Sequence, residues 1–317
     1  MEYKICSNQI GDGASGKVYK IKGVQEPYPI YILKKYEPPN IQKYEKEKLA
    51  LAMTNDDLEP NNNFLLKEKK IEIALTNSDL LAQQNSRYFV FDYLSHGELS
   101  EYIYMFKNKN IDEKFVKLLC YKILIALKRC HELDICHNKI CTKNIMLDDN
   151  FNPIIIHLSE VTMNNESYKK DYKNLGLVLG NMITSGYFKA ISFSEKKNSY
   201  FVKTNNNHNS TKSYIEEEKF WEYLNEMSNI KVSEEFKTFF DILVKSKNDL
   251  NVDDLLQNEW FNDIKQNQKI IEDNLKKEFS NYYNKIKASE KIQRYNFDLK
   301  AIPIFNDNYN SFIYPNL

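Results

Sequence analysis

The chain has 317 residues, of which 42% are hydrophobic and 28% charged, and its 44 lysines and arginines balance 44 aspartates and glutamates. Because this balance creates no global field, we expect neither nucleic acid nor a membrane as a partner, and no apolar run approaches the length of a membrane span. Five cysteines are too few for a disulfide framework in a chain of this length, which indicates a soluble protein of the cytoplasm or nucleus.

The first 92 residues predict a strand-rich region with one helix. Residues 1–35 alternate apolar and polar positions around a glycine-containing loop, which is typical of a hairpin followed by a third strand. Pro38-Pro39 ends that strand, and a helix is predicted at Ile41–Met53 with Leu49 and Leu51 facing inward. The remaining strands are predicted near residues 64–74 and 88–93.

From Leu99 onward the apolar pattern becomes helical, most clearly between Phe115 and His131. Further helices are predicted at residues 171–184, 220–229, 234–245 and 252–261. After residue 262 an amphipathic helix is predicted to about Ala288, and its apolar positions are Ile264, Ile271, Leu275, Tyr282 and Ile286. Two interpretations stay open for this tail: it packs on the preceding helices, or it binds a partner or a second copy of the chain.

A glycine-rich segment near the N-terminus has the spacing G-x-G-x-x-G-x-V, formed by Gly11, Gly13, Gly16 and Val18. Glycine lets backbone N–H groups approach a phosphate without a side-chain clash, so this spacing indicates a phosphate-binding loop. The strand Ile30–Lys34 follows it, which is the context that the motif requires. The alternative is an ordinary glycine hairpin.

The segment Cys136–Met146 reads C-H-N-K-I-C-T-K-N-I-M, and the run Pro153–Ile156 is followed by His157-Leu158-Ser159. These stretches resemble the catalytic loop H-R-D-x-x-x-x-N and the metal-binding D-F-G of protein kinases. With the glycine loop, the lysine strand and a last helix near Trp260, the chain resembles the protein kinase superfamily in the order of its motifs. The helical region most resembles serine/threonine kinases of the calcium/calmodulin type or the AMP-activated type.

The resemblance implies an α+β, two-lobed protein-kinase-like fold. A small lobe at 1–92 would hold an antiparallel β-sheet with one helix, and a larger helical lobe would span 95–261. Together these would form a kinase-like domain at 1–261, followed by a helical C-terminal tail at 262–317.

The resemblance also implies how ATP would bind. Lys34 would contact the phosphates and pair with a helix carboxylate, best matched by Glu47 and next by Glu45. Ile32 replaces a small alanine where adenine would sit, so ATP is predicted only as an optional ligand. The resemblance implies further ATP contacts besides the glycine loop, Val18, Lys34 and Glu47. The backbones of Asp92 and Leu94 would contact adenine, Glu98 would contact the ribose, and Met146 would contact the purine ring.

The family's catalytic positions are degenerate in this chain. Lys139 stands at the place of the catalytic base and His157 at that of the magnesium-binding aspartate, whereas Asn144 is retained. Lysine is a cation where a proton acceptor is needed, and a histidine nitrogen is a poor match to the hard oxygen ligands of magnesium. The pairs Cys130-His131 and Cys136-His137 match no spacing of zinc ligands, so we predict no metal site. Because Lys139 and His157 replace the two aspartates, we also predict no intact catalytic residue.

The sequence therefore predicts a catalytically inactive pseudokinase that acts as a scaffold or allosteric partner of another protein, such as an active kinase. Asp171 resembles the aspartate that braces the catalytic loop of kinases. Only 13 residues separate it from His157, and a segment of this length is too short to form a platform for a peptide substrate. One alternative is an unconventional active serine/threonine kinase that transfers the ATP γ-phosphate, with Glu160 or Asp148 replacing a lost aspartate. The other is a scaffold that binds no nucleotide.

Overall fold

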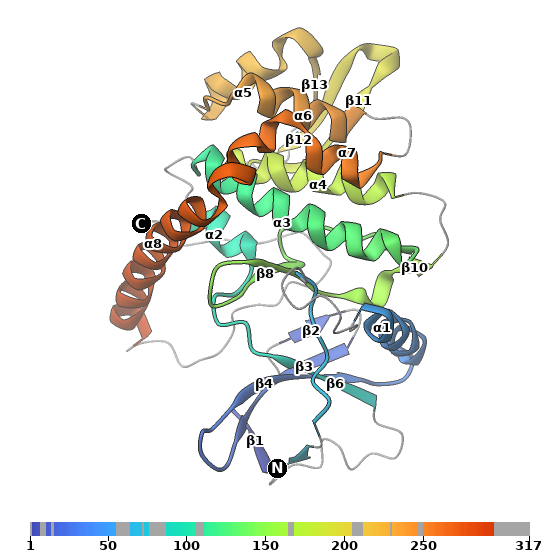
Figure 1. The fold of residues 1–317 in the computed structure, drawn as a ribbon, viewed down its shortest axis with the longest axis vertical. Helices are drawn as coiled ribbons and strands as arrows, with labels where there is room; N and C mark the ends of the chain where they lie inside the picture. The colour runs from blue at the N-terminus through green and yellow to red at the C-terminus, as the bar shows by residue number, and fades with distance from the viewer. Residues whose placement is uncertain are drawn as a thin grey trace. The chain divides into compact units, whose positions relative to one another are not determined.

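The computed structural model describes residues 2–6, 11–13, 16–54, 64–71, 73–75, 87–105, 111–163, 168–204, 212–228, 230–245 and 250–294. The chain divides into two units, which we name the strand unit (residues 1–55, 67–93 and 285–317) and the helical unit (residues 56–66 and 94–284). Strands dominate the N-terminal region and helices the rest (Figure 1), which confirms the predicted α+β class.

The strand unit holds a mostly antiparallel sheet and one helix, α1 (Ile41–Thr54). Its strands run in the order β5-β1-β3-β4-β6, with β2 paired to β3, and β1 pairs in parallel with β5. Alternation along the strands buries Tyr3, Ile21, Leu33 and Val90 in one core. The strands are β1 (Glu2–Ile5), β2 (Gly11–Gly13), β3 (Gly16–Gly23), β4 (Ile30–Tyr36), β5 (Ala74–Leu75) and β6 (Arg87–Asp92).

Two predicted details of the N-terminal region are wrong. Leu49 is 52% exposed whereas Leu51 is 1% exposed. Residues two apart on a helix lie about 200° apart around its axis, so both cannot face the same core. Residues 64–71 form no continuous strand, because only Leu65 and Glu68 make isolated bridges there.

The helical unit is built around α3 (Glu113–Glu132), which lies beside α4 (Lys169–Ile183) in Figure 1. Asp112 caps α3 by accepting a hydrogen bond of 2.9 Å from the backbone N–H of Lys114, which satisfies a free donor of the first turn. The other helices are α2 (Leu99–Met105), α5 (Phe220–Ser228), α6 (Glu234–Lys245), α7 (Val252–Gln257) with a 3₁₀ turn at Glu259–Phe261, and α8 (Asn262–Arg294). The helices predicted from residue 115 to residue 261 all form, with boundaries close to those predicted.

Two short strand pairs frame the segment that resembles the catalytic loop. β7 (Ile135–Cys136) pairs with β10 (Thr162–Met163), and β8 (Ile145–Leu147) pairs with β9 (Pro153–Ile155). A 3₁₀ turn at Leu158–Glu160 lies between β9 and β10. These two strand pairs hold the segments around residues 137 and 157 in place within the helical unit.

The tail helix α8 belongs to the helical unit from Asn262 to Asn284 and packs there. Ile271, Leu275 and Phe279 are buried, and the Phe279 ring stacks on that of Tyr102 at 5.3 Å. Glu272 accepts from the buried Lys122 of α3 at 2.8 Å. Of the two interpretations of the tail, the structure therefore agrees with packing; the side chains of Tyr282 and Ile286 lie outside the described residues.

A three-stranded antiparallel sheet, which the sequence analysis missed, lies between α4 and α5. Its strands are β11 (Phe188–Ser194), β12 (Ser199–Thr204) and β13 (Lys212–Glu216), in that order across the sheet. Its inner face packs on the helices, where the ring of Tyr200 stacks on that of Phe220 at 3.9 Å. The short alternating runs in this segment are a weaker signal than the helical periodicity on either side.

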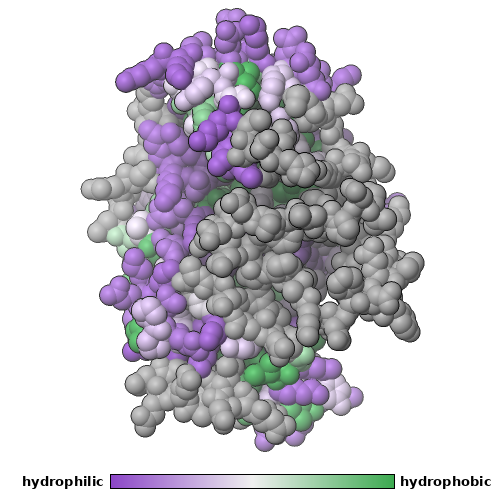
Figure 2. Space-filling view, turned by 180° about the vertical axis from the view of Figure 1, so that it is seen from behind, coloured by the Kyte–Doolittle hydropathy of each residue, from purple (hydrophilic) through white to green (hydrophobic). Residues whose placement is uncertain are grey.

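On the face drawn in Figure 2, hydrophilic residues predominate among those described, and hydrophobic residues form small separate patches. Among the described helices, none combines the length and the apolar character needed to cross a bilayer.

Candidate functional site

A buried ion pair in the strand unit brings Lys34 and Glu47 together. Lys34 on β4 donates to Glu47 of α1 at 2.6 Å, and the two side chains are 5% and 2% exposed. The hydroxyl of Tyr36 donates to the same carboxylate oxygen. Lys34 and Tyr36 reach one oxygen because residues two apart on a strand face the same side. Sequence reasoning missed Tyr36, although this spacing could have found it.

Glu45, the second choice as the partner of Lys34, pairs with Arg87 instead at 2.5 Å. This outer pair is solvated, since the Glu45 side chain is 53% exposed. The arginine also lies over the ring of Tyr44 at 5.4 Å. α1 is thus held to the sheet by an inner buried pair and an outer exposed one.

The glycine loop forms the tight hairpin between β2 and β3, where Gly13 pairs with Gly16. A Cβ on Gly16 would lie 2.6 Å from the carbonyl oxygen of Lys35, and the φ of Gly16 is +144°. Gly16 is therefore required by the backbone packing of the sheet, whether or not a phosphate binds. Val18 pairs with Lys34 across β3 and β4, and Ile32 precedes Lys34 on the same face of β4.

The residues implied for adenine and ribose fall in both units. Asp92 ends β6 in the strand unit and its carboxylate pairs with Lys69 at 2.9 Å. In the helical unit, the Glu98 carboxylate accepts a hydrogen bond of 2.7 Å from the hydroxyl of Ser100. The backbone of Glu98 forms an isolated antiparallel β-bridge with Met146 of β8. Burial raises the pKa of Glu98, which the hydrogen bond from Ser100 partly offsets. Leu94 follows directly after the unit boundary.

The segment that resembles the catalytic loop is braced by Asp171 from the first turn of α4. Its buried carboxylate accepts the backbone N–H groups of His137 at 2.8 Å and Asn138 at 2.7 Å, and the ring of His131 at 3.2 Å. Burial would raise the pKa of Asp171, but the hydrogen bonds from the His131 ring and the His137 backbone help to lower it on balance. The bracing role that the resemblance implies for Asp171 is therefore present in the geometry.

His137 is fully buried at the centre of this loop. Its Nε2 lies 3.0 Å from the carbonyl oxygen of Ile156, which has no proton to give, so the ring donates there. Its Nδ1 accepts from the backbone N–H of Lys139 at 3.2 Å. Burial lowers the pKa of His137, so the ring is neutral and joins the loop to the end of β9.

Lys139 is the residue that the resemblance aligns with the catalytic base of kinases. Lys139 lies 4.0 Å from the carboxylate of Glu160, which follows the triplet resembling D-F-G. The Asn144 amide donates to the backbone oxygen of Lys139 at 2.8 Å. His157 adopts a left-handed conformation with a φ of 67° and precedes the 3₁₀ turn. The Glu160 carboxylate therefore faces a cation.

Asp148, the other candidate replacement, is used in the turn between β8 and β9. One of its oxygens accepts the backbone N–H groups of Asn150 and Asn152, each at 2.8 Å. Its other oxygen accepts the amide of Asn152 at 2.9 Å. The carboxylate therefore closes a turn.

Magnesium does not fit this donor set. The loop offers an amide from Asn144, a nitrogen from His157 and a carboxylate already facing Lys139, whereas magnesium prefers near-octahedral oxygen ligands. Within the part of the chain that the structure describes, no three His, Cys, Asp or Glu side chains gather as a metal site. Burial raises the pKa of Cys136 to about 12 and also raises that of Cys130, so both thiols stay protonated.

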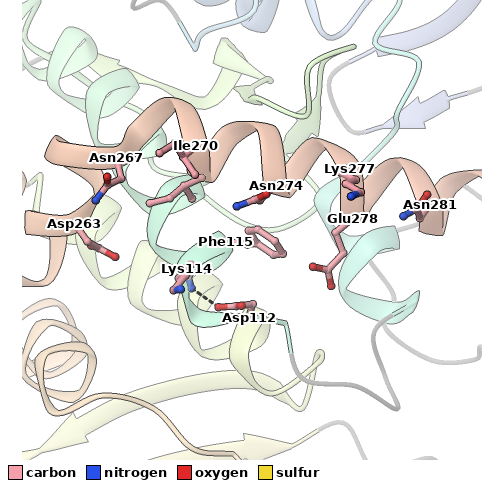
Figure 3. Close-up of a pocket in the computed structure, with 11 residues that line it drawn as sticks. Asp112, Lys114, Phe115, Asp263, Asn267, Ile270, Asn274, Lys277, Glu278 and Asn281 are labelled. Atoms are coloured by element: carbon pink, nitrogen blue, oxygen red, sulfur yellow. Dashed lines mark hydrogen bonds between the residues drawn. The ribbon is translucent and has the colours of Figure 1, made fainter.

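A cavity of about 750 Å³ lies elsewhere in the helical unit, between the N-terminus of α3 and one face of α8 (Figure 3). Asp112 and Phe115 line it from α3, and Asn274 and Glu278 line it from α8. None of the motif residues lines this cavity, so it is separate from the candidate site.

Comparison with known families finds a match for part of the chain. Residues 5–159, just under half of the chain, match the family described as protein kinase domain. None of the curated proteins that were compared matches the chain. The matched region covers the candidate site except for Glu160 and Asp171.

Proposed function

We propose that this protein, whose residues 5–159 match the protein kinase domain family, is a pseudokinase that acts as a scaffold or allosteric partner of another protein. ATP is an optional ligand, and transfer of its γ-phosphate has been lost. The observation that carries this proposal is the Lys139–Glu160 contact of 4.0 Å, which puts a paired cation where a kinase needs a proton acceptor.

The positive charge of Lys139 is the reason why we propose that phosphoryl transfer has been lost. Phosphoryl transfer depends on positioning and on neutralising the charge of the transferring group. A lysine has no lone pair for the substrate hydroxyl proton while it is charged, and its nearest carboxylate is held by that charge. When bound, magnesium would neutralise phosphate charge, but the donor set described above does not suit it.

The hydrogen bonds that hold the loop and the ion pair of Lys34 are nevertheless present. Asp171 braces the loop by accepting two backbone N–H groups, and Lys34 stays paired with Glu47 in the strand unit. The retained Lys34 supports ATP as an optional ligand, and the retained fold supports a binding role.

Incubation of the full chain with γ-labelled ATP and a generic protein substrate tests the loss of transfer. We expect no label in the substrate above that of a heat-denatured sample. Label that disappears in Lys34→Ala and persists in Lys46→Ala, an exposed lysine of α1, would establish an unconventional active kinase instead.

Thermal unfolding with and without ATP tests the optional ligand. ATP at 100 times its dissociation constant adds about 2.7 kcal/mol to the free energy of unfolding. We expect stabilisation of equal size with and without magnesium, and its loss in Lys34→Ala. If millimolar ATP has no effect, the protein is a scaffold that binds no nucleotide.

A further inference from the structure

The outer face of the β11–β12–β13 sheet combines aromatic and basic side chains. Tyr200 and Val202 of β12 are buried against the helices, so the alternate positions of that strand face outward. The register aligns Phe201 of β12 with Tyr214 of β13, and Lys203 of β12 with Lys212 of β13. Two cross-strand pairs, one aromatic and one basic, therefore lie side by side.

The aromatic pair is open to solvent. The rings of Phe201 and Tyr214 are 5.4 Å apart, and Tyr214 is 55% exposed. The ammonium group of Lys197 lies 3.5 Å from the centre of the Tyr214 ring. An exposed tyrosine capped by a cation is a surface suited to a ligand that has both apolar and anionic groups.

The basic pair is unfavourable as it stands. Like charges directly opposite each other in a sheet are destabilising. In the described parts of the chain, no carboxylate pairs with Lys203 or Lys212: Glu216 pairs with Lys219 at 2.6 Å, and Glu217 with Lys245 at 2.5 Å. A lysine on an edge strand protects against aggregation, which accounts for Lys212 but not for Lys203 on the central strand. An anionic partner would compensate both.

We propose that this face binds an acidic, extended segment of the partner protein, which deepens the proposed function by naming the chemistry of the partner. Among the described strands, β13 pairs with β12 alone, so its outer edge offers backbone groups to an added strand. Side chains at alternate positions of that strand would meet Lys212 and Tyr214, which share one face. The segment therefore carries an acidic residue two positions from an aromatic or aliphatic one.

The observations favour a peptide over a nucleic acid. Residues 188–216 contain no arginine, and the net charge of the chain is zero. Nucleic-acid surfaces depend on a larger excess of positive charge. A free sheet edge, by contrast, matches the backbone of another polypeptide.

Fluorescence anisotropy of the full chain with a labelled nine-residue peptide tests the proposal. The peptide alternates glutamate and valine around a central tyrosine, and a second peptide has lysine in place of each glutamate. We expect binding of the acidic peptide alone, weakening as salt is raised, and at least tenfold weaker binding to the double variant Lys203→Glu/Lys212→Glu. Amide hydrogen exchange of β13 should slow when the acidic peptide binds.

The matched control is Lys265→Glu/Lys277→Glu, which makes the same charge change on exposed positions of α8 and should bind normally. A circular dichroism melt checks that both double variants fold, and Tyr214→Ala, which leaves every charge in place, should also weaken binding. Equal loss in both double variants, no binding of the acidic peptide, or tighter binding of a nine-nucleotide oligouridine would overturn the proposal. None of these results would restore phosphotransfer, so the pseudokinase proposal is judged separately by the labelled-ATP assay.

Discussion

At the scale of single residues, the buried ammonium group of Lys34 is compensated by one carboxylate. Glu47 in turn accepts hydrogen bonds from both Lys34 and Tyr36. Removing one partner of a buried ion pair costs far more than removing an exposed pair, because the remaining charge stays out of water. The two pairs that join α1 to the sheet allow this difference to be measured in one helix.

We predict that Glu47→Ala lowers the free energy of unfolding by about 3–5 kcal/mol, because Lys34 would be left buried and unpaired. Glu45→Ala, which breaks the exposed pair with Arg87, should cost less than about 1 kcal/mol. Urea unfolding followed by tryptophan fluorescence measures both. Losses of similar size would mean that the Lys34–Glu47 pair is solvated.

The buried ring of His137 predicts a dependence of stability on pH. Burial lowers its pKa in the folded state below the ordinary value of about 6.5, so on acidification the unfolded chain takes up a proton first. Stability is therefore full above about pH 6.5 and falls as the pH decreases, by at most about 1.4 kcal/mol per pH unit from this group. The lowered pKa of Asp171 adds a further loss only below about pH 4.

Urea unfolding between pH 7.5 and 5.5 tests this prediction in wild type and His137→Gln. The variant should be less stable at pH 7.5, since it disturbs the hydrogen bond to Ile156, but should lose less stability on acidification. The other histidines are common to both proteins, so the difference in slope reports His137. Parallel slopes would contradict a neutral buried ring.

At the scale of elements, α8 illustrates how one helix has a buried and a solvated side. Phe279 is 0% exposed and stacks on Tyr102, whereas Ile270 is 61% exposed. Both are large apolar residues of the same helix, so their contributions separate burial from helix propensity.

We predict that Phe279→Ala lowers the free energy of unfolding by about 3–5 kcal/mol, through lost burial and the cavity left behind. Ile270→Ala should change it by no more than about 0.5 kcal/mol. Thermal and urea unfolding of both variants provide the measurement. A large effect of Ile270→Ala would show that this side of α8 is covered in solution.

At the scale of the whole molecule, the proposed loss of activity depends on two side chains within an intact frame. In the proposed pseudokinase, Lys139 and His157 stand where protein kinases have two aspartates, while Asp171 braces the loop. Restoring both aspartates should therefore make ATP binding depend on magnesium, even without restoring transfer of the γ-phosphate.

We predict that Lys139→Asp/His157→Asp makes stabilisation by ATP larger in the presence of magnesium than in its absence, because two carboxylates would supply the oxygen ligands that magnesium prefers. Thermal unfolding at saturating ATP, with magnesium or with a chelator, measures the difference. The same substitution at Lys265 and Lys269 of α8 serves as the control. No response to magnesium in the site variant would mean that more than these two positions blocks the metal.

The sequence by itself determined the helices between residues 115 and 261 and the glycine hairpin, because these rest on local periodicity or on turn residues. The Lys34–Glu47 pairing was implied by the family resemblance, with Glu45 as an alternative. Only the tertiary structure decided that Tyr36 joins the buried pair, that Glu160 faces Lys139, and that Asp148 closes a turn. It also decided that β11, β12 and β13 form a sheet with Lys203 opposite Lys212. These contacts join residues whose separation along the chain carries no periodic signal. They arise from strand register and from burial, which are properties of the folded chain as a whole.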